Sequence, residues 1–147
     1  MLERFFEKTV RGYLLLTGFL TATAFATFIA PEWSMVNLFS YSEEMMVNKE
    51  YLQGTYQHWG VMVGCIGVLL MVSAYVKPLR TSTMIYSGFE KAMFVGLFIY
   101  NVCVNEYSWF WGWSGVLALD GFVTLYSLLY LYYYVTRDKT KVPAHLR

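Results

Sequence analysis

Charged residues are scarce in this sequence. Asp, Glu, Lys and Arg make up 14% of the 147 residues, while 57% are hydrophobic. In soluble domains about a quarter of all residues are charged, so this composition argues against an ordinary soluble domain. The scarcity is also uneven, because four stretches are nearly free of charge: residues 12–30, 58–76, 88–105 and 112–135.

These four stretches are long enough to cross a lipid bilayer as helices. A spanning helix needs about 20 mostly apolar residues, and the third stretch reaches that length only by accepting Glu90 and Lys91 at its edge. Strands of a membrane β-barrel would be shorter and would alternate, and these runs do not alternate. The sequence therefore predicts an all-α fold, an integral membrane four-helix bundle that forms one domain over residues 1–147.

The Lys and Arg residues predict the orientation of the bundle. Ten of the eleven fall near the termini or around the loop between the second and third helices: Arg4, Lys8, Arg11, Lys77, Arg80, Lys91, Arg137, Lys139, Lys141 and Arg147. The positive-inside rule makes their side the cytoplasmic one, or its organellar equivalent. We therefore expect a multi-pass protein of a bacterial inner membrane or an organellar membrane, with both termini inside. Its basic tail predicts contact with anionic lipid and not with nucleic acid.

A long outer loop, residues 31–57, is expected between the first two helices. Pro31 is expected to stop the first helix. The segment Ser40-Tyr-Ser-Glu43 has the pattern of a capping box, so a short helix on the outer membrane surface can begin there. An ordered acidic loop is the alternative, since the loop carries four glutamates against Lys49.

Motifs that bind metals or exchange disulfides are missing. The two cysteines form no CxxC pair, and the two histidines belong to no CxxCH or HExxH motif. We expect no metal site and no confidently assigned cofactor. His58, predicted to open the second helix, has Met62 four residues on, so a haem or quinone is conceivable only together with partner subunits. The alternative for His58 is a hydrogen bond to a loop carbonyl or a lipid headgroup.

The tryptophans gather at the predicted outer ends of the helices. All five map to this interface: Trp33, Trp59, Trp109, Trp111 and Trp113. Indole rings favour the headgroup level of a membrane, so an aromatic belt explains them. The alternative for Trp109, Trp111 and Trp113 is a docking surface for a partner subunit or a flat ligand.

Asp120 is the unusual residue of the fourth helix. It lies about eight residues, or roughly 12 Å, into that helix, and a carboxylate at such depth should face the bundle interior. It belongs to a polar and aromatic stripe: Trp113, Asp120, Thr124, Ser127 and Tyr134.

No cation is expected at the depth of Asp120. Lys91 is placed at the cytoplasmic lip of the third helix with Glu90, where both reach the interface or pair with Arg80 or Lys77. Asp120 should then be protonated or hydrogen-bonded, either as a proton, cation or ligand site or as a bond to a neighbouring helix. Asn101, near the outer end of the third helix, is expected to join helices and can approach Asp120.

Small residues repeat at helical spacing in three of the predicted helices. They are Gly18 and Ala22 in the first, Gly60, Gly64 and Gly67 in the second, and Gly88 and Gly96 in the third. Small residues on one face let helices approach closely in lipid. We expect these positions to be helix contacts.

The size, the inside termini, the long first outer loop, the HWGVMVGCIG opening of the second helix and the basic turn KPLR resemble the DoxX-like small four-helix membrane proteins. Some members of that group look like small subunits of quinone-linked oxidoreductases and others have no clear role, so the resemblance implies a redox-associated subunit as one possible function. Because no catalytic set is complete, the sequence favours a non-catalytic accessory or scaffold subunit of a larger membrane complex, with other membrane subunits and lipids as partners. The alternatives are a redox-associated subunit that helps form a quinone or haem pocket, and a small solute or proton transporter that uses Asp120.

Overall fold

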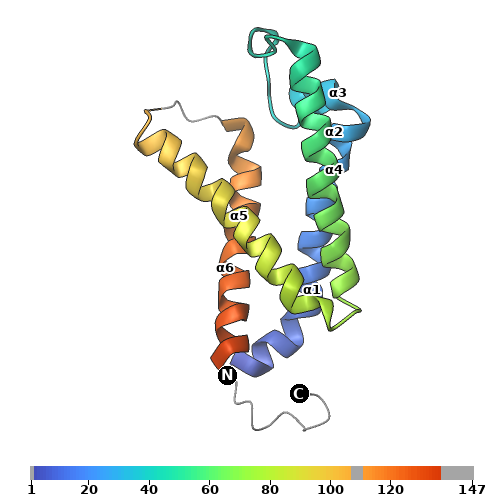
Figure 1. The fold of residues 1–147 in the computed structure, drawn as a ribbon, viewed down its shortest axis with the longest axis vertical. Helices are drawn as coiled ribbons and strands as arrows, with labels where there is room; N and C mark the ends of the chain where they lie inside the picture. Colours follow the sequence, from blue (N-terminus) through green and yellow to red (C-terminus); the bar gives the residue numbers. More distant parts are fainter. Residues whose placement is uncertain (1, 107–110, 137–147) are drawn as a thin grey trace.

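The computed structural model describes residues 2–106 and 111–136. Over these residues the chain is helical and has no strand, which confirms the all-α class. Four long helices dominate the fold: α1 (Leu2–Ala22), α4 (Lys49–Ser73), α5 (Leu79–Cys103) and α6 (Ser114–Thr136). The helix α1 packs along α4, and α5 packs along α6. The two pairs meet at the end of the molecule that carries the N-terminus and diverge towards the other end (Figure 1).

Three segments of the described chain are long and apolar enough to cross a membrane. They are Arg4–Ile29, Lys49–Ser73 and Trp111–Thr136. The helix α5 is as long as α4, with 25 residues each. Its polar residues, Glu90 and Lys91 among them, lower its mean hydropathy. The remaining predicted span, residues 88–105, therefore lies on a helix of suitable length that has charged residues at its middle.

The second and third long helices, α4 and α5, are longer than the apolar stretches that predicted them. The second begins at Lys49 instead of residue 58, and the third begins at Leu79 instead of residue 88. An apolar run marks only the part of a helix that lipid or protein must cover, whereas backbone hydrogen bonds continue through the polar turns beside it. As a result His58 does not open α4, and Lys91 does not lie at the end of α5.

The segment after α1 also differs from the expectation. The first helix turns at Thr23 and Ala24 and resumes as the short helix α2 (Phe25–Ile29). Pro31 then begins α3 (Pro31–Asn37), where a missing N–H costs nothing. The predicted capping box yields only the 3₁₀ turn η1 (Glu43–Met45), because Ser40 adopts a left-handed φ of 56° and caps no helix.

Glycines bring α4 directly against α1 and α2. A Cβ added at Gly64 would lie 2.7 Å from the ring of Phe25, and one added at Gly18 would lie 2.8 Å from the carbonyl oxygen of Gly67. Gly60 and Gly67 face Thr27 and Ala22 at still closer range. Such close backbone contact is how helices gain packing energy in lipid.

The first helix is joined to α6 through aromatic side chains. The rings of Tyr13 and Tyr126 stack with their centroids 3.7 Å apart, and Phe6 packs edge-on against Tyr126. The Tyr13 hydroxyl donates to the carbonyl oxygen of Val123 at 3.3 Å. Aromatic pairs of this kind add to the burial energy, so this contact closes the bundle at the end where the helix pairs meet.

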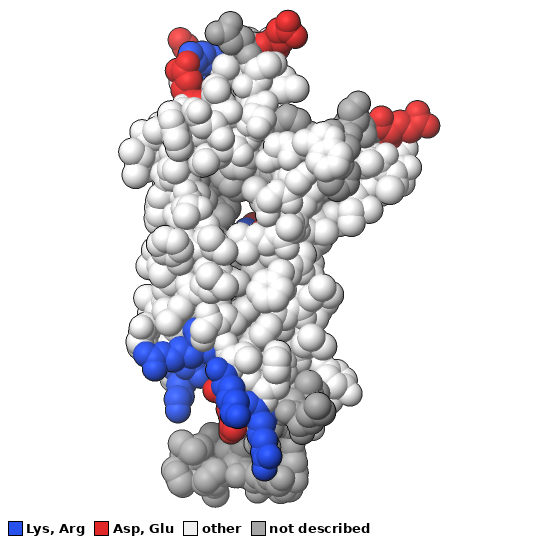
Figure 2. Space-filling view, turned by 180° about the vertical axis from the view of Figure 1, so that it is seen from behind, with Lys and Arg blue, Asp and Glu red and all other residues white. Residues whose placement is uncertain are grey.

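Charges separate to the two ends of the molecule. Basic residues gather near the N-terminal end and acidic residues at the far end, with a long uncharged surface between them (Figure 2). Arg80 also caps the C-terminus of α4, because its guanidinium donates to the carbonyl oxygens of Ser73 and Ala74 at 2.9 and 2.7 Å. Cations near the last turn of a helix satisfy carbonyls that have no partner inside it.

Candidate functional site

A cavity of about 470 Å³ lies between the two helix pairs. Its walls come from the end of α1 and α2, from the loop around Phe39, and from α4, α5 and the start of α6. Figure 2 shows a hollow midway along the uncharged surface, with blue and red atoms at its base. The two charged residues that line the cavity are Lys91 and Asp120.

Lys91 and Asp120 form an ion pair across α5 and α6. The ammonium nitrogen lies 3.4 Å from Oδ1 of Asp120, and the two side chains are 4% and 3% exposed. Lys91 is twelve residues from each end of α5, at its midpoint. The expectation that Asp120 has no cation at its depth was wrong, and so was the placement of Lys91 at the cytoplasmic lip.

Glu90 adds a second carboxylate to this pair. Its Oε2 lies 3.2 Å from the Lys91 ammonium, and its side chain is 29% exposed. Glu90 and Lys91 therefore interact with each other and with Asp120, and not with Arg80, whose donors bind carbonyls of α4. A buried charge is tolerated when opposite charge and hydrogen bonds surround it.

The approach of α5 to α6 is set by Gly88. An added Cβ there would lie 2.7 Å from the Cβ of Ser127. Gly88 is one turn before Lys91, so the same contact that brings the helices together places the ammonium within reach of Asp120. Thr124 lies one turn after Asp120 and donates to its backbone carbonyl at 2.8 Å.

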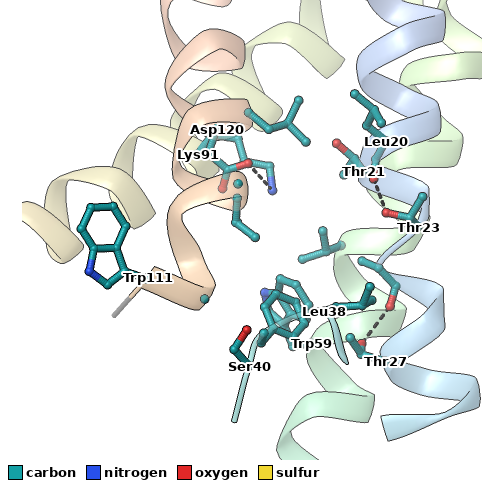
Figure 3. A pocket seen from close by; sticks show the side chains of 17 residues that line it. Leu20, Thr21, Thr23, Thr27, Leu38, Ser40, Trp59, Lys91, Trp111 and Asp120 are labelled. Carbon is teal, nitrogen blue, oxygen red and sulfur yellow. Dashed lines mark hydrogen bonds and ion pairs between the residues drawn. The ribbon is translucent and has the colours of Figure 1, made fainter. Parts of the chain in front are cut away.

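The opposite wall carries hydroxyl groups (Figure 3). Thr21 lines the cavity and is 4% exposed, and its hydroxyl has no hydrogen-bond partner among the described residues. Thr27 also lines the cavity, but its hydroxyl donates to the carbonyls of Ala24 and Tyr56 at 2.8 and 3.1 Å. A buried hydroxyl without a partner is costly, so Thr21 offers a site for a polar atom in the cavity.

Aromatic side chains form the far end of the cavity. Trp59 lines it and packs against Phe39 and Trp113, with ring centroids 5.9 and 6.1 Å apart. Trp111 belongs to the lining but is 78% exposed, and Figure 3 shows its ring directed away from the cavity. Trp109 lies outside the described residues.

The structure does not bring the other sequence-predicted residues to this cavity. His58 is exposed on α4, and Asn101 accepts a hydrogen bond of 2.8 Å from Asn105 on its own segment. Gly96 faces open space, because an added Cβ would meet no atom within 4 Å. Within residues 2–106 and 111–136, no three His, Cys, Asp or Glu side chains are placed to hold a metal ion.

Sequence reasoning missed Lys91 and Thr21 as site residues. The signal for both was spacing: Lys91 continues a series with Thr83 and Ser87 at intervals of four, and Thr21 continues a series with Tyr13 and Thr17 at the same interval. All six side chains are buried. Residues four apart share a helix face, so the two series predict polar faces that point inward.

No protein-family model matches this chain, and neither the curated proteins nor the solved structures give a match. The DoxX-like resemblance therefore stays a prediction from the sequence. The geometry of the site is a mostly apolar cavity that contains an ion pair and the Thr21 hydroxyl, which has no partner within the described part of the chain.

Proposed function

We propose that this protein is a multi-pass membrane protein that binds a small lipophilic molecule in the cavity between its helix pairs. One observation carries the proposal: the buried Lys91–Asp120 pair opens onto a cavity whose other walls are mostly apolar. Ligand pockets are typically apolar with a few polar groups that fix orientation. Ionisable residues at membrane depth are costly, which makes them functional candidates by default.

The proposal includes α5 as a fourth spanning helix. Its length of 25 residues supports this, and so does the pairing of Lys91 within the bundle. At 1.5 Å per residue the helix is about 37 Å long, enough for a hydrocarbon core of about 30 Å. A hairpin of α5 and α6 then crosses the membrane twice, like α1 and α4.

The orientation proposed is the one with both termini on the cytoplasmic-equivalent side. Basic residues at the N-terminal end support it: Arg4, Lys8 and Arg11 lie in the first half of α1, and Lys77 and Arg80 lie beside Arg11. At the opposite end Lys49 is paired with Glu32. The cavity then lies in the outer half of the bundle, in a bacterial inner membrane or an organellar membrane.

A pair of glycine variants tests the binding function. Gly115 lines the cavity and Gly121 does not, although both lie on α6 and an added Cβ would meet no atom within 4 Å at either position. Gly115→Phe should therefore fill the cavity, while Gly121→Phe changes the same helix equally without filling it. The chain is reconstituted in lipid nanodiscs and titrated by calorimetry with three phenyl compounds of different charge: benzyltrimethylammonium, N,N-dimethylbenzamide and phenylacetate.

The expected result is that at least one of the three compounds binds the parent chain and the Gly121→Phe variant, and that Gly115→Phe abolishes this binding. Binding that is equal in the two variants would place the ligand elsewhere on the protein. The absence of binding by all three compounds would contradict the proposed function.

The accessory-subunit function predicted from the sequence is a second candidate, favoured by one observation on α5. The outer half of this helix diverges from α4 (Figure 1), and Met93, Leu97 and Tyr100 on it are more than half exposed. A partner membrane subunit would cover such a face. Purification in a mild detergent tests this candidate: a second subunit in stoichiometric amount supports it, and a chain that purifies alone contradicts it.

A further inference from the structure

The charged groups at the base of the cavity are unequal in number. Lys91 supplies one ammonium, which lies 3.2 Å from Glu90 and 3.4 Å from Asp120. Two carboxylates therefore share one cation. When all three groups are ionised, the cluster has a surplus negative charge in a buried place.

A buried surplus charge does not persist without compensation, because desolvation penalises it strongly. Two kinds of compensation are open to a carboxylate here: a proton on one of its oxygens, or a second cation beside it. The cavity provides the space for that second cation, since Asp120 and Lys91 line it. An anionic ligand would meet an ammonium that two carboxylates already neutralise.

The remaining walls suit an organic cation. Trp59 lines the cavity, and an indole ring attracts cations through its electron-rich face. Thr21 adds a buried hydroxyl whose oxygen has no partner within the described part of the chain, and this oxygen can accept from an N–H donor. The other lining is largely apolar, which favours a cation with a hydrocarbon body over a hydrated metal ion.

We propose that the cavity binds a lipophilic organic cation in exchange for one proton. Before binding, one of the two carboxyl groups beside Lys91 is neutral and holds a proton. When the cation enters, the O–H bond of that carboxyl breaks and its proton leaves to solvent. Both carboxylates are then ionised, and the ligand pairs with Asp120, which lines the cavity. The total charge of the site is the same before and after, so binding leaves no buried surplus.

The groups around the exchange site define its dependence on pH. On α5 they are Glu90 and Lys91, and on α6 the nearest titratable group besides Asp120 is Tyr126, towards the inner end. On α1 it is Tyr13, stacked on Tyr126. On α4 they are Tyr56 and the exposed His58, towards the outer end. The exchange is therefore assigned to the two carboxylates that contact Lys91.

Calorimetry in nanodiscs tests this proposal, which rests on the proposed binding function. Benzyltrimethylammonium is titrated in two buffers that differ in ionisation enthalpy, because the difference in heat gives the number of protons released. N,N-dimethylbenzamide and phenylacetate serve as the uncharged and anionic comparisons. The expected result is release of about one proton per cation bound and weaker affinity for the other two compounds by about tenfold.

Two variants make the test specific to the carboxylates. Glu90→Gln removes the surplus carboxylate but keeps the Lys91–Asp120 pair, so proton release should vanish and cation affinity should fall by about tenfold. A circular dichroism spectrum and a free energy of unfolding like those of the parent chain show that the variant is folded. Glu50→Gln, an exposed residue at the start of α4, is the control for surface charge and should behave like the parent chain.

The outcomes separate this proposal from the binding function itself. Equal binding of the charged and uncharged compounds, or cation binding without proton release, overturns the exchange proposal and leaves the cavity as a binding site. Preferred binding of phenylacetate overturns it as well, because Lys91 then governs the site. Absence of binding by all three compounds overturns both proposals.

Discussion

Gly88 of α5 packs directly on Ser127 of α6, and this contact fixes how far Lys91 lies from Asp120. A Cβ at Gly88 would lie 2.7 Å from the Cβ of Ser127, so no larger residue fits without separating the helices. The ion pair one turn further along spans 3.4 Å. A shift of a few ångströms at the glycine would therefore break it.

Replacing Gly88 should show this dependence. Gly88→Leu should lower the free energy of unfolding by about 1–3 kcal/mol through overpacking and should also lower ligand affinity, because the ion pair at the cavity base is lost. Gly96→Leu is the matched control, since it lies on the same helix and faces open space. The two free energies of unfolding are measured by SDS titration of the protein in mixed micelles; equal losses would contradict the packing described for Gly88.

The ion pair itself should behave as a unit. Lys91→Met leaves the carboxylate of Asp120 buried without its cation, at a cost of about 3–5 kcal/mol. Asp120→Asn is expected to lower the free energy of unfolding as well. If no cation lay near the Asp120 carboxyl, the same substitution would leave that free energy nearly unchanged. The double variant Lys91→Met with Asp120→Asn removes both charges and should recover much of the loss. Additive losses in this double-mutant cycle would mean that the two groups do not interact.

The Tyr13 hydroxyl should make a measurable contribution to the α1–α6 contact. Tyr13→Phe keeps the ring stacked on Tyr126 but removes the hydrogen bond to the carbonyl of Val123, which should cost about 1 kcal/mol. Tyr132→Phe is the control because Tyr132 is 62% exposed. Thermal unfolding monitored by circular dichroism compares the two, and an equal midpoint for Tyr13→Phe and the parent would show that the hydroxyl contributes nothing.

The orientation can be checked with reporter fusions. A reporter joined after Arg147 should be active only on the cytoplasmic side, and one inserted at Asn48 only on the outer side, because the basic residues gather at the N-terminal end. Alkaline phosphatase and green fluorescent protein report the two sides separately. Phosphatase activity at Arg147 would reverse the whole arrangement, and the cavity would then open to the inner side.

Hydropathy was sufficient to predict the helical class because the apolar runs are long. It could not place Lys91, since a charged residue at the edge of an apolar run looks like the end of a helix. Whether Lys91 marks an end or a midpoint depends on the residues from Leu79 to Gly88, where Thr83, Met84 and Ser87 form a buried face.

Asp120 was recognised as a buried carboxylate from its own helix. Its partner comes from α5, and pairing between helices follows from packing that no single helix encodes.

The predicted aromatic belt was a similar case. Trp59 and Trp113 lie at the same end of the molecule, yet both pack on Phe39, and Trp59 lines the cavity. The interfacial preference of indole rings predicts that the tryptophans gather at one end of the helices, but it does not predict the direction in which each ring points.

The arrangement of the helices in two sequential hairpins has a consequence for biogenesis. Lys91 and Asp120 belong to the same hairpin, α5 with α6, so each charge meets its counterion within one continuous segment of the chain. On the proposed topology, a ribosome-bound chain can therefore deliver Lys91 to the translocon together with both of its carboxylate partners, Glu90 and Asp120. If α5 and α6 cross the membrane as proposed, these charges enter the bilayer without help from the first half of the protein, and the cavity forms only when the second hairpin docks on the first.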